Sequence, residues 1–229
     1  MYEAVHAHPD GSTTAARFAA TAARMGYDGV VIRSRDATPD YAAVREASGI
    51  DAVDAAEVVA PDPEHASGAV GGLRPEHTLL SVRGGTVRLN RFAVEHERVD
   101  VLTRPMAGDG DVNHVLAHCA AENGVRIEFD FGPVLRATGG ERVRALRDLR
   151  KLRELVSDAD APFVVSANPA THLELRAPRE LVAVGEAVGF DPETVRAGLR
   201  EWGALAERNR HRQSESFVGP GVERGRHDG

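Results

Sequence analysis

The chain has 229 residues, of which 42% are hydrophobic and 28% are charged, a size and balance that predict one sizeable globular domain. No apolar run approaches the roughly 18 to 20 residues needed to span a bilayer, and residues 1–11 lack the basic lead and apolar core of a signal peptide. Cys119 is the single cysteine, which excludes an internal disulfide. We therefore expect a cytoplasmic protein without a membrane partner.

Arginine supplies almost all of the positive charge. Lys151 is the one lysine, so 27 of the 28 basic residues (28 minus 1) are arginine, against a formal net charge of −7. Scarce lysine with abundant Asp, Glu and Ala is typical of proteins from halophiles with molar internal salt. At about 1 M salt the screening length is only about 3 Å, so binding to a polyanion would depend on close arginine contacts. The net charge therefore neither supports nor excludes a nucleic-acid ligand.

Short apolar runs alternate with helical patterns along the chain. Polar capping residues such as Ser12 precede helical segments, and glycines such as Gly26 and Gly124 follow them. Strands are predicted at residues 3–8, 30–32, 51–60, 78–82, 99–103, 126–131 and 163–166. Helices are predicted at 12–25, 40–47, 87–96, 112–122, 141–155, 178–188 and 192–208, with one short helix in the Pro- and Gly-rich segment 61–76.

This alternation predicts parallel strands joined by crossover helices. We expect an α/β fold of the TIM-like (β/α) barrel type, with about seven parallel strands and surrounding helices, in a single domain over residues 1–208. A closed or nearly closed barrel is favoured over an open doubly wound sheet, because the GxGxxG motif of dinucleotide-binding sheets is absent. Residues 209–229 are polar and Gly-rich and are predicted to form a flexible tail.

Two successive predicted strands end on arginine. Arg83 follows the apolar run 79–82, and Arg104 follows the strand at 99–103. In alternating strand and helix folds, ligands bind at the carboxyl ends of the strands, and the planar fork of arginine suits phosphate. The sequence therefore predicts an anionic ligand at this end. The helix between the two strands adds three further candidate contacts: Arg88, Asn90 and Arg91.

These side chains also have simpler interpretations. Any of the arginines could be a surface charge or pair with a nearby acid such as Glu95, and Asn90 could cap the turn. The helix at 141–155 carries six cations but also Asp148 and Glu154, which is typical of a solvated face. A surface for RNA or a partner is the alternative for that helix.

Two sets of motifs resemble known families. The opening segment EAVHAHPDGSTTAARFAATAARMGYDGVVI is similar to the start of PHP-family metal phosphoesterases, which begin with a strand ending in His-x-His, an Asp-Gly turn, a helix and a second strand. A second set runs through residues 1–200 and includes SVRGG, LNRFAVEHERVDVLTRP, VNHVLAHCAAENGVRIEF and VSANPATHLELRAPREL. In this order it resembles the protein component 3 family of archaeal ribonuclease P, which shares the barrel fold with the PHP group.

The second resemblance implies an RNA-binding, non-catalytic subunit of ribonuclease P. In that family the RNA subunit removes the 5′ leader of precursor tRNA by magnesium-dependent hydrolysis, so we expect magnesium to serve the RNA and this chain to hold no cofactor. The implied partners are the ribonuclease P RNA, protein component 2 in a heterotetramer, other protein subunits and precursor tRNA. The Leu-Arg-x-Pro-Arg motif of the family falls on Arg176 and Arg179, which therefore join the predicted RNA contacts.

The first resemblance raises the question of a metal site. His6 and His8 lie two apart on the first predicted strand and so share a face, and imidazoles suit zinc- and manganese-like ions. Glu57 matches an acidic ligand position of the PHP pattern.

The chain departs from the PHP pattern at three other ligand groups. Ile32-Arg33-Ser34-Arg35 stands where that pattern has Thr-Asp-His, Arg104-Pro105 where it has His-Pro, and Ser166-Ala167-Asn168 where it has Asp-x-His. A cation thus replaces one ligand and would repel a metal. We expect no metal site, with His6, His8 and Glu57 as remnants. The alternatives are a PHP-type metal-dependent phosphoesterase and a barrel that binds a small anion.

Overall fold

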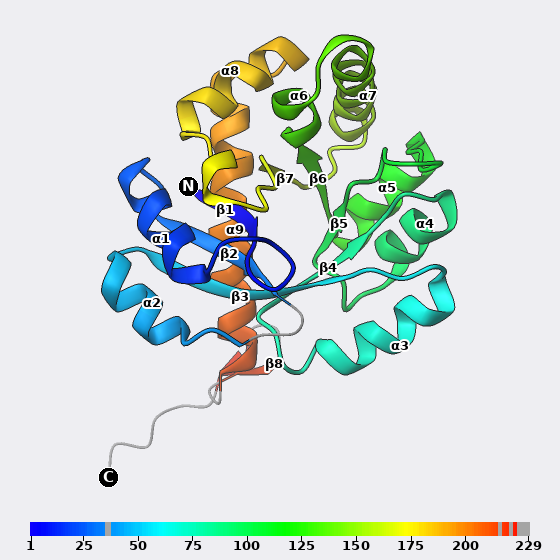
Figure 1. Ribbon diagram of the computed structural model, residues 1–229. Coiled ribbons are helices and arrows are strands. Elements are labelled where there is room, and N and C mark those ends of the chain that lie inside the picture. The colour runs from blue at the N-terminus through cyan, green and yellow to red at the C-terminus, as the bar shows by residue number, and fades with distance from the viewer. Residues whose placement is uncertain (35–37, 215–216, 220–221, 224–229) are drawn as a thin grey trace.

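A computed structural model of the chain describes residues 1–34, 38–214, 217–219 and 222–223. Seven strands form one parallel sheet in the order β1 to β7, and helices surround it (Figure 1), which confirms the predicted (β/α) barrel class. The strands are β1 (Tyr2–His6), β2 (Gly29–Arg33), β3 (Asp51–Val58), β4 (Leu79–Arg83), β5 (Val101–Thr103), β6 (Arg126–Asp130) and β7 (Phe163–Ser166).

Helices fill the connections between the strands. Most begin after a Thr, Asp or Asn whose side-chain oxygen accepts a backbone N–H of the first turn, as Thr86 does for α4. The short helices α6 and η1 were not predicted. The helices are α1 (Ala15–Arg24), α2 (Tyr41–Ser48), α3 (Pro63–Leu73), α4 (Val87–Glu95), α5 (His114–Asn123), α6 (Gly132–Arg136), α7 (Gly139–Asp158), the 3₁₀ helix η1 (His172–Glu174), α8 (Pro178–Val188) and α9 (Pro192–Gln213). Near the end of the chain, β8 (Phe217–Gly219) and β9 (Val222–Glu223) pair antiparallel.

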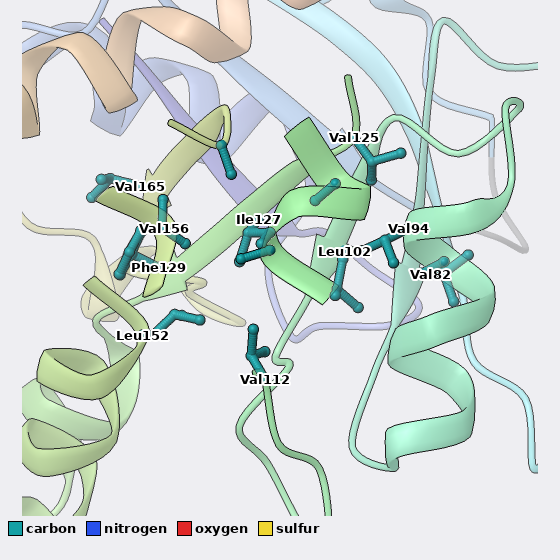
Figure 2. Packing of buried hydrophobic residues seen from close by; sticks show 14 of the residues in the cluster. Val82, Val94, Leu102, Val112, Val125, Ile127, Phe129, Leu152, Val156 and Val165 are labelled. Atoms are coloured by element: carbon teal, nitrogen blue, oxygen red, sulfur yellow. The ribbon is translucent and has the colours of Figure 1, made fainter. Parts of the chain in front are cut away.

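Side chains alternate across each strand, so the sheet has an inner and an outer face. The outer face packs against the helices, where Figure 2 shows Ile127 and Phe129 of β6 near Leu152 and Val156 of α7. The inner face forms a separate apolar cluster on the side of the barrel interior nearer the amino ends of the strands. Its members are Ala4, Val31, Val53, Ala55, Leu79, Val101 and Val164 from the strands, with Trp202, Leu205 and Ala206 from α9.

α9 closes the barrel where the sheet does not. At the gap between the edge strands β1 and β7, the His6 N–H of β1 donates to the carbonyl oxygen of Pro169, three residues beyond β7, at 2.9 Å. Trp202 of α9 is 1% exposed and donates its indole N–H to the Val165 carbonyl at 3.0 Å. The small side chains of Ala4 and Ala55 leave room for this ring inside the sheet.

The last turn of α9 corrects the predicted start of the tail. α9 runs to Gln213, so the assignment of residues 209–213 to a flexible tail is wrong. Asn209 is buried, and its amide donates to the Thr78 carbonyl at 2.9 Å and to an Asp100 carboxylate oxygen at 2.8 Å. The polar character of this turn thus reflects hydrogen bonds to residues at the amino ends of the strands. Much of the remaining predicted tail lies outside the described residues.

Within the part of the chain that the structure describes, no helix is long and apolar enough to cross a membrane.

Candidate nucleic-acid interface at the carboxyl end of the barrel

The inner face of the sheet changes from apolar to charged toward the carboxyl ends of the strands, and Arg33 lies at this change. It is the last residue of β2 and only 1% exposed. One guanidinium nitrogen donates to Glu128 at 2.5 Å and another to the Asn168 side chain at 3.1 Å. The guanidinium carbon lies 5.2 Å from the ring centroid of Trp202, and this cation–π contact stabilises the buried charge. A buried arginine therefore occupies the centre of this end of the barrel.

Glu57 links Arg33 to the predicted contact Arg83. Its carboxylate accepts two bonds from Arg83, at 3.0 and 2.5 Å, and one from the Thr103 hydroxyl at 2.6 Å. The nearest nitrogen of Arg33 is 3.7 Å away. Burial alone would raise the pKa of Glu57, but the positive charges beside it, led by Arg33, lower the pKa to about 2. Glu57 is therefore an ionised anchor that fixes Arg83, whose side chain remains 34% exposed.

Asp130 holds Arg104 in a similar way, through a weaker contact. The Arg104 Nε lies 3.4 Å from a carboxylate oxygen of Asp130 but lacks the geometry of a hydrogen bond. The same carboxylate accepts the Asn168 amide at 3.1 Å and the Gly132 N–H at 2.8 Å. Burial raises the pKa of Asp130, and Arg104 opposes that rise. Arg104 adopts a left-handed backbone (φ 48°), and 33% of its side chain is exposed.

His6 and His8 are not brought together. β1 ends at His6, so the predicted strand over residues 3–8 is too long, and His8 lies beyond it on the surface. His6 is 7% exposed, and its Nε2 has no partner within the described structure. Burial first and Arg33 second lower the pKa of His6 to about 4, so the imidazole is neutral at pH 7.

These residues do not fit a metal ion. The oxygens of Glu57 are taken by Arg83 and Thr103, and the Arg33 guanidinium lies beside the same carboxylate, where its charge opposes a cation. In the described ranges, no group of three or more His, Cys, Asp or Glu side chains is placed to hold a metal. We derive no metal chemistry for this end of the barrel.

The helix between Arg83 and Arg104 separates the predicted contacts into two kinds. Arg88 is exposed and forms no ion pair or side-chain hydrogen bond with any described residue. Arg91 is also exposed, but its Nε pairs with Glu95 one turn later, at 2.7 Å. Asn90, in contrast, is fully buried. An RNA contact is therefore geometrically available to the two arginines and not to Asn90.

Asn90 instead holds the loop that follows β5. Its amide donates to the carbonyl oxygens of Pro105 at 2.8 Å and Asp111 at 2.9 Å. A Cβ on Gly84 would lie 2.1 Å from the Asn90 Oδ1, so glycine is needed at position 84 for this close approach. Asn90 shapes the rim of the barrel and does not reach its surface, which corrects its predicted role.

The second predicted pair lies beyond β7. Arg176 donates to the carbonyl oxygens of Leu173 at 3.1 Å and Leu175 at 2.9 Å, and it has no ion pair with an acid of the described ranges. Arg179 is exposed in the first turn of α8 and has no ion pair within the described residues. A cation at a helix N-terminus is unfavourable, so a bound anion would stabilise this position.

The basic face of α7 is largely bonded within the chain. Lys151 pairs with Asp111 at 2.6 Å. Arg150 donates to the Ala187 carbonyl near the end of α8 at 2.9 Å, and Arg153 donates to the carbonyl of the C-cap residue Gly189 at 3.0 Å. Bonds of this kind satisfy the free carbonyls of a helix end. They are consistent with the solvated face favoured by the sequence pattern.

A cavity of about 340 Å³ opens at this end of the barrel, and Arg33, Arg83 and Arg104 all line it. The importance of Arg33 was missed at the sequence level, although the run Gly29–Arg33 carried a signal. Arginine directly after four residues of a fully buried strand must bring its own counter-charges. The site is thus a ring of arginines whose inner members are held by buried acids.

Comparisons with known proteins give a consistent result. The family model described as RNase P subunit p30 matches residues 1–214. Ribonuclease P protein component 3 of Halorubrum lacusprofundi is 60% identical, with 100% of this chain and 99% of that protein covered. The protein of the same name from Methanococcoides burtonii is 32% identical over 96% of this chain and 91% of the relative.

Solved structures agree on the fold. A chain in the cryo-EM structure of archaeal ribonuclease P with mature tRNA superposes with a TM-score of 0.85 at 20% identity, and both chains are covered completely. The putative histidinol phosphatase of Listeria monocytogenes superposes with a TM-score of 0.55 at 9% identity, over 76% of this chain and 97% of that one.

Proposed function

The chain belongs to the RNase P subunit p30 family, and from this premise we propose that it contacts RNA, as a ribonuclease P subunit, through the arginine ring at the carboxyl end of its barrel. The ring consists of Arg83, Arg88, Arg91, Arg104, Arg176 and Arg179. The observation that supports the RNA contact most directly is the exposed charge of Arg88 and Arg179. Both are exposed and lack any acidic partner among the described residues.

The six arginines have different roles in this proposal. Arg83 and Arg104 are held by buried acids, so their guanidiniums are already oriented before RNA arrives. A pre-ordered side chain loses little entropy on binding. Arg88 and Arg179 are exposed and supply charge that no described acid compensates. Contacts of this kind bind phosphate and set register, and they read little base sequence.

The chemistry in this proposal belongs to the RNA. The charged residues at the barrel end are engaged in holding one another, so this chain positions RNA and does not attack the phosphoester. Magnesium would serve the RNA subunit. Component 2 in a heterotetramer, the other protein subunits and precursor tRNA are the remaining proposed partners.

Reconstitution tests the proposal. The chain alone should leave precursor tRNA intact, and together with ribonuclease P RNA and component 2 it should lower the magnesium concentration needed for cleavage. The variant Arg83→Gln/Arg104→Gln should require more magnesium than the parent. A matched control is Arg98→Gln/Arg212→Gln, because these exposed arginines lie together at the opposite end of the barrel. Cleavage by the isolated chain, or equal behaviour of both variants, would overturn the proposal.

A further inference from the structure

A second cavity, of about 470 Å³, lies beside the arginine ring. It is enclosed by the loop after β5, the end of β6, α6 and α7, which Figure 1 shows on the side of the barrel opposite α2. Arg104 lines both this cavity and the smaller one at the barrel end. A ligand bound at the ring could therefore extend into it.

Apolar and charged side chains share the walls of the cavity. Met106, Pro133, Leu149 and Leu152 line it, and Ala145 leaves space at the side of α7. Cavities of a few hundred cubic ångströms that combine apolar surface with converging polar groups are typical of small-ligand sites. The apolar part of the lining suits a ring system better than a hydrated ion.

One carboxylate oxygen of a residue that lines this cavity lacks a hydrogen-bond partner among the described residues. Glu128 is fully buried, and one of its oxygens accepts from Arg33 at 2.5 Å. The other oxygen, Oε2, is buried and has no hydrogen bond within the described structure. Burial raises the pKa of Glu128, and the ion pair with Arg33 opposes that rise. An unpaired buried oxygen costs roughly 1 to 3 kcal/mol, which a ligand N–H would offset.

Two arginines at the cavity are available to an anion. Arg104 keeps 33% of its side chain exposed beside its ion pair with Asp130, and Arg144 is exposed with no ion pair or side-chain hydrogen bond to a described residue. Arg136 is the third arginine of the lining, and its guanidinium donates to the Ala167 carbonyl at 2.9 Å.

Four carboxylates offset these three arginines. They are Glu128, Asp130, Glu141 and Asp148. This near balance opposes burial of a phosphate chain inside the cavity, and it favours a ligand with a neutral body that donates hydrogen bonds. Asp and Glu accept from the exocyclic amine of cytosine in nucleic-acid complexes.

We propose that this cavity receives one unstacked nucleobase of single-stranded RNA that carries an exocyclic amino group, with the amine on Glu128 and the adjoining phosphate on Arg104 and Arg144. The inference rests on the proposed RNA contact and adds a base-reading element to a surface that otherwise reads phosphates. Unstacked bases held in protein pockets are the usual means of sequence-specific RNA recognition.

Short RNA probes test the inference. Octamers of cytidylate and of uridylate are titrated against the full chain at pH 8 and followed by fluorescence anisotropy. We expect the cytidylate octamer to bind about tenfold more tightly, the size of one satisfied buried hydrogen bond. Ala145→Phe should fill the cavity and abolish the difference. Ala47→Phe, on the exposed face of α2, is the matched control and should retain it.

Glu128→Gln gives a result that loss of packing cannot imitate. Arg33 requires an acceptor, so the glutamine oxygen stays on Arg33 and the amide NH₂ takes the place of Oε2. The preference should then reverse toward uridylate, whose O4 accepts a hydrogen bond. If this variant does not fold, the Ala145→Phe comparison decides alone.

The outcomes separate the two proposals. Equal binding of both octamers by the parent chain would overturn the base pocket and leave the RNA contact standing. Absence of RNA binding by the chain, alone and with its RNA subunit, would overturn the RNA contact itself. If Ala145→Phe impairs assembly with component 2 while the preference for cytidylate persists, the cavity seats a protein side chain and the inference is wrong.

Discussion

Two groups of arginines at the same end of the barrel differ in what they have beside them. Arg33, Arg83 and Arg104 each lie against a buried acid, with Arg33 itself fully buried. Arg88 and Arg179 lie on exposed first turns of helices and lack acidic partners within the described chain. Positive charge that is neutralised internally orients the guanidiniums of the rim, whereas positive charge left free adds net attraction for RNA. The number of arginines at a surface therefore overestimates the net positive charge that can bind an anion.

The largest test of this comparison is Arg33→Met. Methionine would leave Glu57 and Glu128 buried without their shared counter-charge, and breaking a buried pair in this way costs about 3 to 5 kcal/mol. Denaturant unfolding should show that loss. Arg88→Ala is the control and should change stability by less than about 0.5 kcal/mol. Equal stability of the two variants would mean that the inner arginines are as dispensable as the outer ones.

The dependence of the unfolding free energy on pH tests the buried charge of Arg33 through its neighbour His6. The unfolded histidine binds a proton below about pH 6.5, whereas burial and Arg33 hold the folded pKa at about 4. Protons therefore favour the unfolded chain between these values, and stability should fall by about 2 to 4 kcal/mol as pH drops from 6.5 to 4.

The measurement needs the variant His6→Gln as a reference, because Glu3 titrates in the same pH range. Burial raises the pKa of Glu3 to about 7, so protonating it stabilises the fold as pH drops from about 7 toward 4.5 and partly masks the effect of His6. The difference between the parent chain and His6→Gln isolates the histidine. Parallel stability curves for the two proteins would refute a neutral buried His6.

The smallest expected effect concerns the outer arginines. Arg88→Ala/Arg179→Ala should leave the unfolding free energy unchanged and weaken RNA binding. Each lost phosphate contact should lower the slope of log K against log salt by about 0.7 to 0.9. Arg98→Ala/Arg212→Ala, at the amino end of the barrel, should keep the slope of the parent. Identical slopes for both variants would indicate that RNA binds elsewhere.

The sequence predicted the architecture well because its signals are local. Alternating apolar runs and capped helices required only neighbouring residues, and the strand ends at Arg83 and Arg104 followed from them. Asn90 was assigned wrongly because an amide in a polar-looking helix gives no sign of the carbonyl oxygens it meets 15 and 21 residues later. The length of α9 was underestimated for the same reason, since Asn209 is defined by partners such as Thr78 on distant strands.

The pairing of charges lay beyond local patterns altogether. Arg33, Glu57 and Glu128 come from three strands, and their contact depends on the register of the whole sheet. A single sequence shows an arginine at the end of a buried strand and several acids elsewhere, but not which of them meet. For this reason the sequence marked the outer contacts and missed the residue that organises the inner ones.

The closure of the barrel by α9 has a consequence for the order of events during synthesis. Trp202 fills the interior, and Asn209 ties the amino ends of two strands that were made more than 100 residues earlier. A chain emerges from the ribosome with its N-terminus first, so the strands emerge well before α9, which closes the barrel. The barrel can be completed only after α9 has left the ribosome, and the arginine ring above Trp202 acquires its final geometry at that stage.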